Sequence, residues 1–283
     1  METTEQNVIM VATDFSPIGD VAIDHAANMA KLLNSKLVVL HVINTTTRKK
    51  LLDGKKNTDP VAEKLNAIIQ KVKAEYGIAA EYLAPQGSIF STIAEAARNV
   101  DARFLFLGTH GKKGMQFLLG SFALKVVTTS PAPVVVVQEQ AKDSSYKNIV
   151  YPLNLEIGSK QKVKWASFMH KYFGSEIHII VYNISDDATQ RKLKADLHQV
   201  ERILAQNNVK YTSTIADAKG SFGKQIIDFA TEKKADAIMI STDPEGLSWN
   251  PFGTETERII YNMSKIPVIC INSKDLKVII GGP

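Results

Sequence analysis

Short apolar runs alternate with longer amphipathic stretches along the whole chain, and this alternation limits the fold more than any other feature. In the first half the predicted strands are 8–12, 37–43, 79–83, 104–107 and 134–137. The stretches with helical periodicity between them are 21–33, 61–76, 89–97 and 121–128. Strands that alternate with helices form a mostly parallel sheet covered on both faces. The first half is therefore predicted to be a doubly wound, five-stranded α/β unit.

The same pattern then starts again. The second set of predicted strands is 148–151, 177–182, 210–215, 237–240 and 268–271. The second set of predicted helices is 163–173, 188–207, 222–233 and 254–263. Shifting the sequence by about 140 residues places Asn154 on Asp14, and a shift of about 133 places Gly253 on Gly120. We therefore predict two tandem Rossmann-like domains, 1–142 and 143–283, joined by the polar segment 139–146.

Composition excludes several other classes of protein. The hydrophobic share of 45% and charged share of 22% are typical of a globular chain, and one cysteine rules out a disulfide scaffold. The apolar runs are far shorter than the roughly 20 residues of a membrane-spanning helix. With an acidic N-terminus, a cytoplasmic protein without membrane attachment is expected. The net charge of +5 is shared almost evenly between the halves, so nucleic acid is not the expected partner.

A glycine-bearing loop follows the fourth predicted strand. It contains Gly108, Gly111, Gly114 and Gly120, and Ser121 opens the next predicted helix. Ligands of open α/β sheets bind beyond the carboxyl ends of the strands, and a helix N-terminus favours phosphate. The loop lacks both the P-loop motif and the dinucleotide fingerprint. It is a candidate phosphate site of another kind.

The segment Ala12-Thr13-Asp14 ends the first predicted strand. An acidic residue there can accept hydrogen bonds from ribose hydroxyls. Equally, Asp14 or Ser16 can simply cap the helix that begins near Pro17, and residue types alone leave both interpretations open.

Other polar candidates are weaker. His110 lies in the glycine-bearing loop, where it could contact phosphate, act as an acid or base, or only shape the turn. His41 and Cys270 lie within apolar strands and are expected to be core residues. No His or Cys pair has metal-ligand spacing, and no nucleophile elbow occurs, so neither a metal site nor a catalytic residue is predicted.

Together these segments resemble the universal stress protein family. Its hallmark is G-x2-G-x9-G-[ST] after a strand, with an early Asp after the first strand. Here Gly108 and Gly111 begin this motif, and Gly120-Ser121 closes it. The resemblance implies an adenine-nucleotide α-hydrolase-like fold and a site for ATP or another adenine nucleotide, with Mg²⁺ as a candidate partner of its phosphates. The implied nucleotide-binding residues are Ala12, Thr13, Asp14, Val42, Gly108, His110, Gly111, Gly114, Gly120, Ser121 and Phe122.

Within that resemblance, Asp14 would contact ribose or adenine, and Val42 would meet the base through its backbone. Gly120, Ser121 and Phe122 would bind phosphates. One departure is visible, because eight residues separate Gly111 from Gly120 where the family usually has nine. Gly114 could absorb that change through a positive φ.

The second half keeps the architecture and loses the motif. Ser241 stands where the first half has Gly108, and Pro244, which has no N–H donor, stands where it has Gly111. We expect this half to bind no nucleotide, with an uncharged ligand as the alternative. The terminal strands 134–137 and 268–271 would pair to form an intrachain pseudo-dimer, and a further homodimer remains open.

Three functions are compatible with these residues. The first is a tandem universal stress protein that binds ATP in its first domain and acts in stress response as a sensor or regulator, with at most weak ATPase activity. The second is a nucleotide-independent interaction module, favoured by the shortened loop. The third is an ATP pyrophosphatase or adenylyltransferase, disfavoured because residues 12–16 lack the S-G-G-x-D-S type of loop.

Overall fold

The computed structural model describes residues 7–44, 60–109, 117–138, 145–155, 158–242 and 255–272. Ten strands form one sheet in the order β3-β2-β1-β4-β5-β10-β9-β6-β7-β8. The strands of the first half are β1 (Val8–Ala12), β2 (Lys36–Leu40), β3 (Ala80–Leu83), β4 (Ala102–Thr109) and β5 (Val134–Gln138). Those of the second half are β6 (Asn148–Leu153), β7 (Glu176–Val181), β8 (Tyr211–Ile215), β9 (Ala237–Thr242) and β10 (Val268–Asn272).

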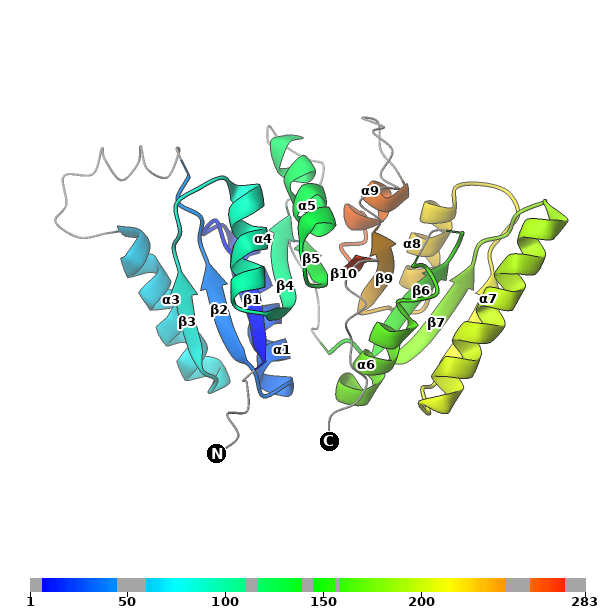
Figure 1. Ribbon diagram of the computed structural model, residues 1–283, viewed down its shortest axis with the longest axis horizontal. Coiled ribbons are helices and arrows are strands. Elements are labelled where there is room, and N and C mark those ends of the chain that lie inside the picture. Colours follow the sequence, from blue (N-terminus) through cyan, green and yellow to red (C-terminus); the bar gives the residue numbers. More distant parts are fainter. Residues whose placement is uncertain are drawn as a thin grey trace.

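Helices cover both faces of this sheet. The helices of the first half are α1 (Pro17–Leu32), α3 (Pro60–Tyr76), α4 (Ile89–Asn99) and α5 (Phe117–Thr129). Those of the second half are α6 (Val163–Phe173), α7 (Asp187–Gln206), α8 (Phe222–Glu232) and α9 (Glu255–Ile260). One apolar core packs α1, α3, α6 and α7 against one face, and the other core packs α4, α5, α8 and α9 against the opposite face. In Figure 1, α5 and α9 lie above the sheet and α1 and α6 lie below it.

Each half has the same strand order, because the second half read outward from β10 repeats the order of the first read outward from β5. All pairings within a half are parallel, as is typical of sheets that helices cover on both faces. This confirms the predicted doubly wound α/β fold. The strand order reverses beside β1 and beside β6, so the carboxyl ends of these strands are the positions where such sheets bind ligands.

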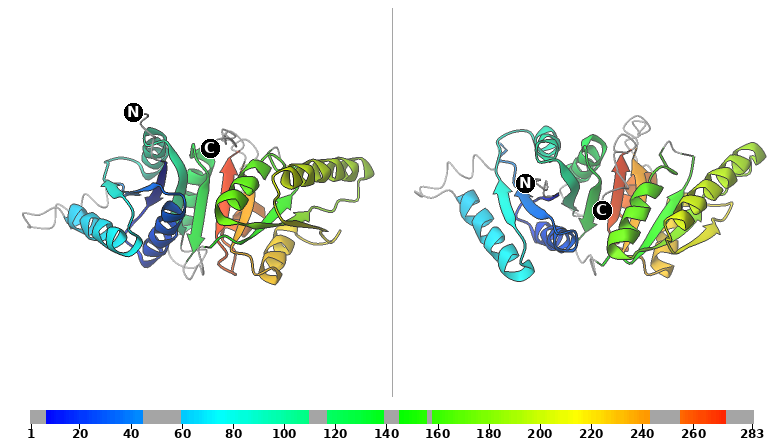
Figure 2. Two further views of the ribbon diagram at one scale, coloured as in Figure 1. Left: turned by 90° about the horizontal axis from the view of Figure 1, so that it is seen from below. Right: turned by 60° about the horizontal axis from the view of Figure 1, so that its bottom comes forward.

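The two halves meet at β5 and β10, which pair in antiparallel fashion between them (Figure 2). Val135 lies opposite Ile269, and these residues occupy equivalent positions in their halves. Both strands consist of buried apolar residues followed by a buried amide. The edge pairing therefore converts two five-stranded units into one continuous sheet.

Two amides reach across this junction. The Gln138 side chain donates to the carbonyl oxygens of Ile260 (3.3 Å) and Asn262 (3.0 Å), at the end of α9. In the reciprocal position, the Asn272 amide donates to the carbonyl oxygen of Thr128 (3.1 Å), near the end of α5. The last carbonyls of a helix lack partners within the helix, so each half supplies the C-terminal cap of a helix in the other.

Aromatic residues add to the contact on the α1 and α6 face. Phe104 of β4 makes an edge contact with Trp165 of α6, with ring centroids 5.1 Å apart. The Tyr146 hydroxyl lies 3.0 Å from Nδ1 of His25 in α1, and both side chains are buried. Burial raises the pKa of the Tyr146 phenol well above its usual range, so this hydroxyl stays protonated.

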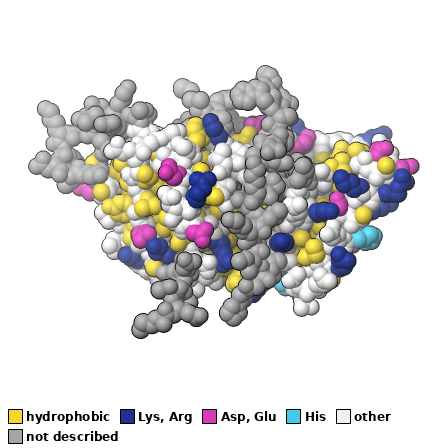
Figure 3. Space-filling model, in the orientation of Figure 1, with side chains coloured by type: hydrophobic (Ala, Val, Ile, Leu, Met, Phe, Trp, Pro, Cys, Tyr) yellow, Lys and Arg dark blue, Asp and Glu magenta, His cyan; other side chains and the backbone are white. Residues whose placement is uncertain are grey.

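The charged surface is mixed. Figure 3 shows Lys and Arg side chains on both halves with Asp and Glu among them. Within the described ranges, no helix is both long and apolar enough to cross a membrane.

Candidate functional site

The turn that follows β1 is held by its own side chains. The Thr13 hydroxyl oxygen accepts from the Phe15 N–H (3.0 Å), and Asp14 Oδ1 accepts from the Ser16 N–H (3.0 Å). Ser16 then caps α1, because its Oγ accepts from the Gly19 N–H (3.2 Å). The sequence left open whether Asp14 accepts hydrogen bonds from ribose or whether Asp14 or Ser16 only caps the helix, and the structure gives the role of the cap to Ser16. Asp14 is exposed, and its second carboxylate oxygen makes no hydrogen bond or ion pair with the residues that the structure describes.

The turn lies between the ends of β2 and β4. Ala12 pairs with Leu40 on one side and with Leu107 on the other, so the residues after Ala12 continue between His41 and Gly108. The Thr13 N–H still donates to the Leu40 carbonyl (2.9 Å). This register brings Ala12, Thr13, Asp14, Val42 and Gly108 to one edge of the sheet, as predicted.

Val42 presents its backbone toward this turn. The N–H groups of His41 and Ile43 donate to Leu83 and Pro85, which lie on the β3 side. Peptide groups of a strand alternate in direction, so those of Val42 face the β1 side. Because β1 has already ended at Ala12, they face the space beyond its end. This is the arrangement that backbone recognition of a base requires.

Two glycines allow the turn and α1 to pack closely. A Cβ at Gly108 would lie 2.8 Å from both the carbonyl oxygen and Cγ2 of Ile18, in the first turn of α1. A Cβ at Gly19 would lie 2.8 Å from Oγ1 of Thr13. Gly108 is therefore required for packing, whether or not it also lines a ligand.

Phe15 and His41 form the wall of the turn on the α3 side. Phe15 has a φ of 62°, a left-handed conformation that is costly for a bulky residue. Its ring stacks on His41 with centroids 4.3 Å apart, and Lys64 Nζ lies 5.2 Å from the ring centroid. His41 Nδ1 lies 2.8 Å from the Thr13 carbonyl oxygen. His41 was predicted to be a core residue, and it is buried, but its Nε2 has no hydrogen-bond partner among the described residues.

Thr109 is the last residue of β4 and therefore lies at this edge of the sheet. It was not predicted to be a site residue. It is 3% exposed and its hydroxyl has no partner in the described part of the chain. A buried hydroxyl without a partner carries a desolvation cost that a ligand or water would relieve. Thr109 stands next to Gly108 in the sequence, and nothing in the sequence pattern marks it as a ligand-binding residue.

The predicted phosphate-binding residues are only partly described. His110, Gly111 and Gly114 lie outside the described residues. Gly120, Ser121 and Phe122 lie within α5, which begins at Phe117. The predicted helix start at Ser121 is therefore wrong by four residues. The first four N–H groups of a helix lack partners within it, and here these belong to residues 117–120 rather than to Ser121 and Phe122.

The second half has a different chemistry at the equivalent edge. A small cavity of about 30 Å³ lies at the ends of β6 and β9, enough for about one water. Asn154, Lys162, Ser241, Glu255 and Thr256 contribute polar lining, and Pro152, Phe222, Ile226, Ile240 and Ile259 are its apolar lining. Asn154 follows β6 as Asp14 follows β1, as the repeat predicted. Asp243, Pro244, Trp249, Pro251 and Phe252 lie outside the described residues.

The side chain of Lys162 lines the cavity at the ends of β6 and β9. The side chain is 1% exposed, and its Nζ donates to the carbonyl oxygens of Pro152 (2.6 Å) and Ser159 (2.8 Å). Nζ also lies 4.0 Å from the centroid of the Tyr151 ring. The sequence reasoning missed this residue, because a Lys before a helix reads as an exposed position.

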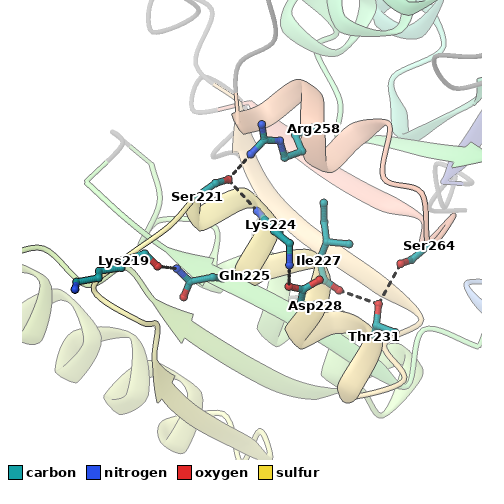
Figure 4. A network of polar contacts seen from close by, with 9 residues as sticks. All are labelled: Lys219, Ser221, Lys224, Gln225, Ile227, Asp228, Thr231, Arg258 and Ser264. Atoms are coloured by element: carbon teal, nitrogen blue, oxygen red, sulfur yellow. Dashed lines mark hydrogen bonds and ion pairs between the residues drawn. The ribbon is translucent and has the colours of Figure 1, made fainter.

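Glu255 occupies the N-terminus of α8. Its Oε2 accepts from the Gly223 N–H (2.6 Å), and the Ser221 hydroxyl lies 3.0 and 2.9 Å from its two oxygens. Arg258 forms an ion pair with Glu255 (3.6 Å). Figure 4 shows that Arg258 also donates to Ser221, whose Oγ accepts from the Lys224 N–H. A carboxylate of the chain itself therefore takes the place that an anion would take at this helix end.

Cys270 and two histidines of the second half, His170 and His178, make contacts within the protein. Cys270 is buried in β10, and burial raises the pKa of its thiol, which makes a reactive thiolate unfavourable. His178 contacts Thr212 (2.9 Å), and His170 contacts the Ser175 carbonyl (2.8 Å). Among the residues with described positions, no three His, Cys, Asp or Glu side chains are grouped to hold a metal.

The fold and the edge at β1 define a Rossmann-like α/β protein with a candidate nucleotide site. The profile of the universal stress protein family matches residues 7–138. Universal stress protein MJ0531 of Methanocaldococcus jannaschii is 28% identical over 142 residues, which are 48% of this chain and 84% of that protein. Residues 7–138, just under half of the chain, are therefore similar to the universal stress protein family.

Solved structures extend the likeness in fold to the whole chain. A universal stress protein from Archaeoglobus fulgidus DSM 4304 has a TM-score of 0.74 at 23% identity, covering 95% of this chain and 99% of that one. A putative universal stress protein from Pseudomonas aeruginosa UCBPP-PA14 has a TM-score of 0.62 at 16% identity, covering 96% and 94%. At these identities the likeness establishes the shared fold of both halves.

Proposed function

We propose that this chain is a tandem universal stress protein that binds an adenine nucleotide, ATP, in its first domain. The observation that carries the proposal is the edge after β1, where an exposed Asp14 carboxylate lies at the same strand ends as Val42, whose peptide groups face the space beyond β1. The domains would be 1–142 and 143–283, with the β5–β10 junction making an intrachain pseudo-dimer. The role would be regulatory, in stress response.

The residues at this edge fit a nucleoside. One Asp14 oxygen is fixed by the Ser16 N–H, which leaves the other to accept from ribose hydroxyls. The backbone of Val42 would pair with the base, and the buried Thr109 hydroxyl has no partner among the described residues. Gly108 would allow close approach. His110, Gly111, Gly114, Gly120, Ser121 and Phe122 would surround the phosphates.

The chemistry at this edge favours binding over catalysis. Asp14 is the carboxylate of the turn, and it is placed for hydrogen bonding to ribose rather than for activating a water beside the phosphates. At most slow ATP hydrolysis would follow. A regulatory protein of this kind would signal through the conformation that nucleotide stabilises.

A nucleotide-independent interaction module is the second candidate. The observation that favours it is Glu255, which shows that the fold is stable with one of its two edges closed by internal contacts. If internal contacts also closed the edge beside β1, the chain would bind partner proteins without nucleotide.

Calorimetric titration of the full chain with ATP separates the two functions. Asp14→Asn keeps an acceptor for the Ser16 N–H and removes the charge, so ATP affinity should fall by about tenfold. Asn154→Ala, at the equivalent position of the second half, is the matched control and should leave ATP affinity unchanged. Absence of heat from wild-type protein at millimolar ATP would refute nucleotide binding. A mass spectrum of small molecules released by denaturing the purified protein would identify any bound nucleotide directly.

A further inference from the structure

We infer that His41 is a positioning residue that holds Asp14 in place and makes ligand affinity at this edge depend on pH. The inference rests on the proposed nucleotide site, because Asp14 is its central group. His41 contacts both neighbours of Asp14 in sequence. It bonds to the Thr13 carbonyl on one side and stacks on the Phe15 ring on the other.

The hydrogen bond fixes which nitrogen of the ring carries the proton. A carbonyl oxygen can only accept, so His41 Nδ1 must donate to Thr13 across the 2.8 Å contact. In the neutral ring, Nε2 is then an acceptor with a lone pair. That atom is buried and has no partner in the described parts of the chain. The ring is therefore held in the Nδ1–H form by the turn that carries Asp14.

Phe15 depends on the same ring. Its left-handed backbone conformation, with φ of 62°, is disfavoured for an aromatic residue and persists only where surrounding contacts outweigh its cost. The stacked His41 ring, at an interplanar angle of 28°, supplies one such contact. Loss of the ring would release Phe15 toward ordinary φ values and rotate the preceding peptide, which belongs to Asp14.

Protonation would disturb this arrangement. A charged imidazolium carries a second N–H at Nε2, which would be buried without an acceptor. Burial lowers the pKa of His41, while the bond to Thr13 and the Asp14 carboxylate oppose the shift and Lys64 adds to it. These are the charged groups of the turn and of α3 that face the ring. The neutral form is thus present at neutral pH, and acidification below the lowered pKa of His41 charges the ring and loosens the turn.

Two substitutions separate the contacts of the ring. His41→Asn keeps a donor near the position of Nδ1 and loses the stacking. His41→Phe keeps the stacking and loses the donor. Each substitution should weaken ATP binding by about threefold to tenfold at pH 7.5, which is the effect expected from the loss of one hydrogen bond or one aromatic contact. Neither variant can titrate at this position, so both should lose the additional weakening that wild-type protein shows at pH 5.5.

His178→Asn is the matched control, because His178 is also a partly buried His with a lowered pKa and lies in the second half. Its ATP affinity and pH dependence should match wild-type protein. Equal pH dependence in wild-type protein and His41→Phe would overturn the inference. So would unchanged ATP affinity in both His41 variants.

A measurement without ligand keeps this inference separate from the proposed function. Nitrogen-15 NMR of the free protein should show His41 as the Nδ1–H tautomer. His41→Phe should shift the amide signals of residues 14–16, and His178→Asn should leave them unchanged. A Nε2–H tautomer, or unshifted amides, would overturn the positioning role even if ATP binds. If those signals behave as expected and ATP fails to bind, only the nucleotide assignment is lost.

Discussion

Substitution of Gly223 by Ala should destabilise the protein only while Glu255 is present. A Cβ at Gly223 would lie 2.1 Å from Oε2 of Glu255, well inside van der Waals contact, so the carboxylate must leave the N-terminus of α8. It would then lose its bonds to the Gly223 N–H and the Ser221 hydroxyl. Hydrogen bonds to a charged group contribute about 1.5–3 kcal/mol, and the half-exposed setting places this pair near the lower limit.

The higher helix propensity of Ala acts in the opposite direction and raises the free energy of unfolding. Ala in place of Gly inside a helix stabilises by up to about 1 kcal/mol, although the second position of a helix gains less than its middle. The expected net change with Glu255 in place is therefore a loss of about 1 kcal/mol. In a Glu255→Ala background, no carboxylate needs to move, and Gly223→Ala should stabilise by a few tenths of a kcal/mol. The coupling between the two positions should be about 1–2 kcal/mol.

Urea denaturation of wild-type protein, both single variants and the double variant measures this cycle. Comparable slopes against urea would show that the change lies in the folded state. The coupling should weaken as salt is raised, because the Arg258–Glu255 pair is half exposed. If Gly223→Ala stabilised both backgrounds equally, Glu255 would not sit on the N-terminus of α8, and the account of the second edge would fail.

Three further substitutions test other contacts, each by the urea midpoint of the full chain. Gly108→Ala should cost about 1–3 kcal/mol, since its Cβ would meet the main-chain oxygen of Ile18 at 2.8 Å; an unchanged midpoint would contradict this close packing. Lys162→Met fills a similar volume but removes the Lys162 donor from the carbonyl oxygens of Pro152 and Ser159, of which the second keeps the Tyr151 hydroxyl as a donor, so a loss of about 1–3 kcal/mol is expected; a gain would show that desolvation of the buried charge outweighs its hydrogen bonds. Gln138→Leu removes the donor that caps α9 from the other half and should cost about 1–3 kcal/mol; no loss would mean that this cap does not stabilise the junction.

The fold could be predicted because its signals are local and repeated. Strands such as Val134–Gln138 are short β-branched runs, and α6 (Val163–Phe173) has helical periodicity with Gly174 in a left-handed conformation at its end. The start of α5 could not be placed in this way. Gly120 resembles a loop residue, yet Phe117–Leu119 before it are helical. A helix can include a glycine at a modest cost, so a glycine alone does not mark where a helix begins.

The sequence could predict those parts of the candidate site whose location depends only on the position of the backbone in the sheet. The strand ends beside β1 place Asp14, Val42 and Gly108 together in any doubly wound sheet. The contacts that hold them were not predictable, because they join residues far apart in sequence. His41 lies 28 residues from Thr13, and its role depends on the ring orientation rather than on residue type. Thr109 is likewise identified only by its buried hydroxyl, which has no partner in the described part of the chain.

Comparison of equivalent positions in the two halves shows how the edges diverged. In the first half, Lys125 Nζ lies 4.4 Å from the centroid of the Phe90 ring, which joins α5 to α4. The shift of about 133 residues places Arg258 on Lys125 and Gly223 on Phe90. The cation is retained, while the aromatic ring is replaced by a glycine whose missing side chain leaves room for Glu255. The second edge therefore gained an internal anion as well as losing the glycine motif. A substitution that restores glycines there would still leave a carboxylate that repels phosphate, so recovering nucleotide binding in the second half requires removal of Glu255 as well.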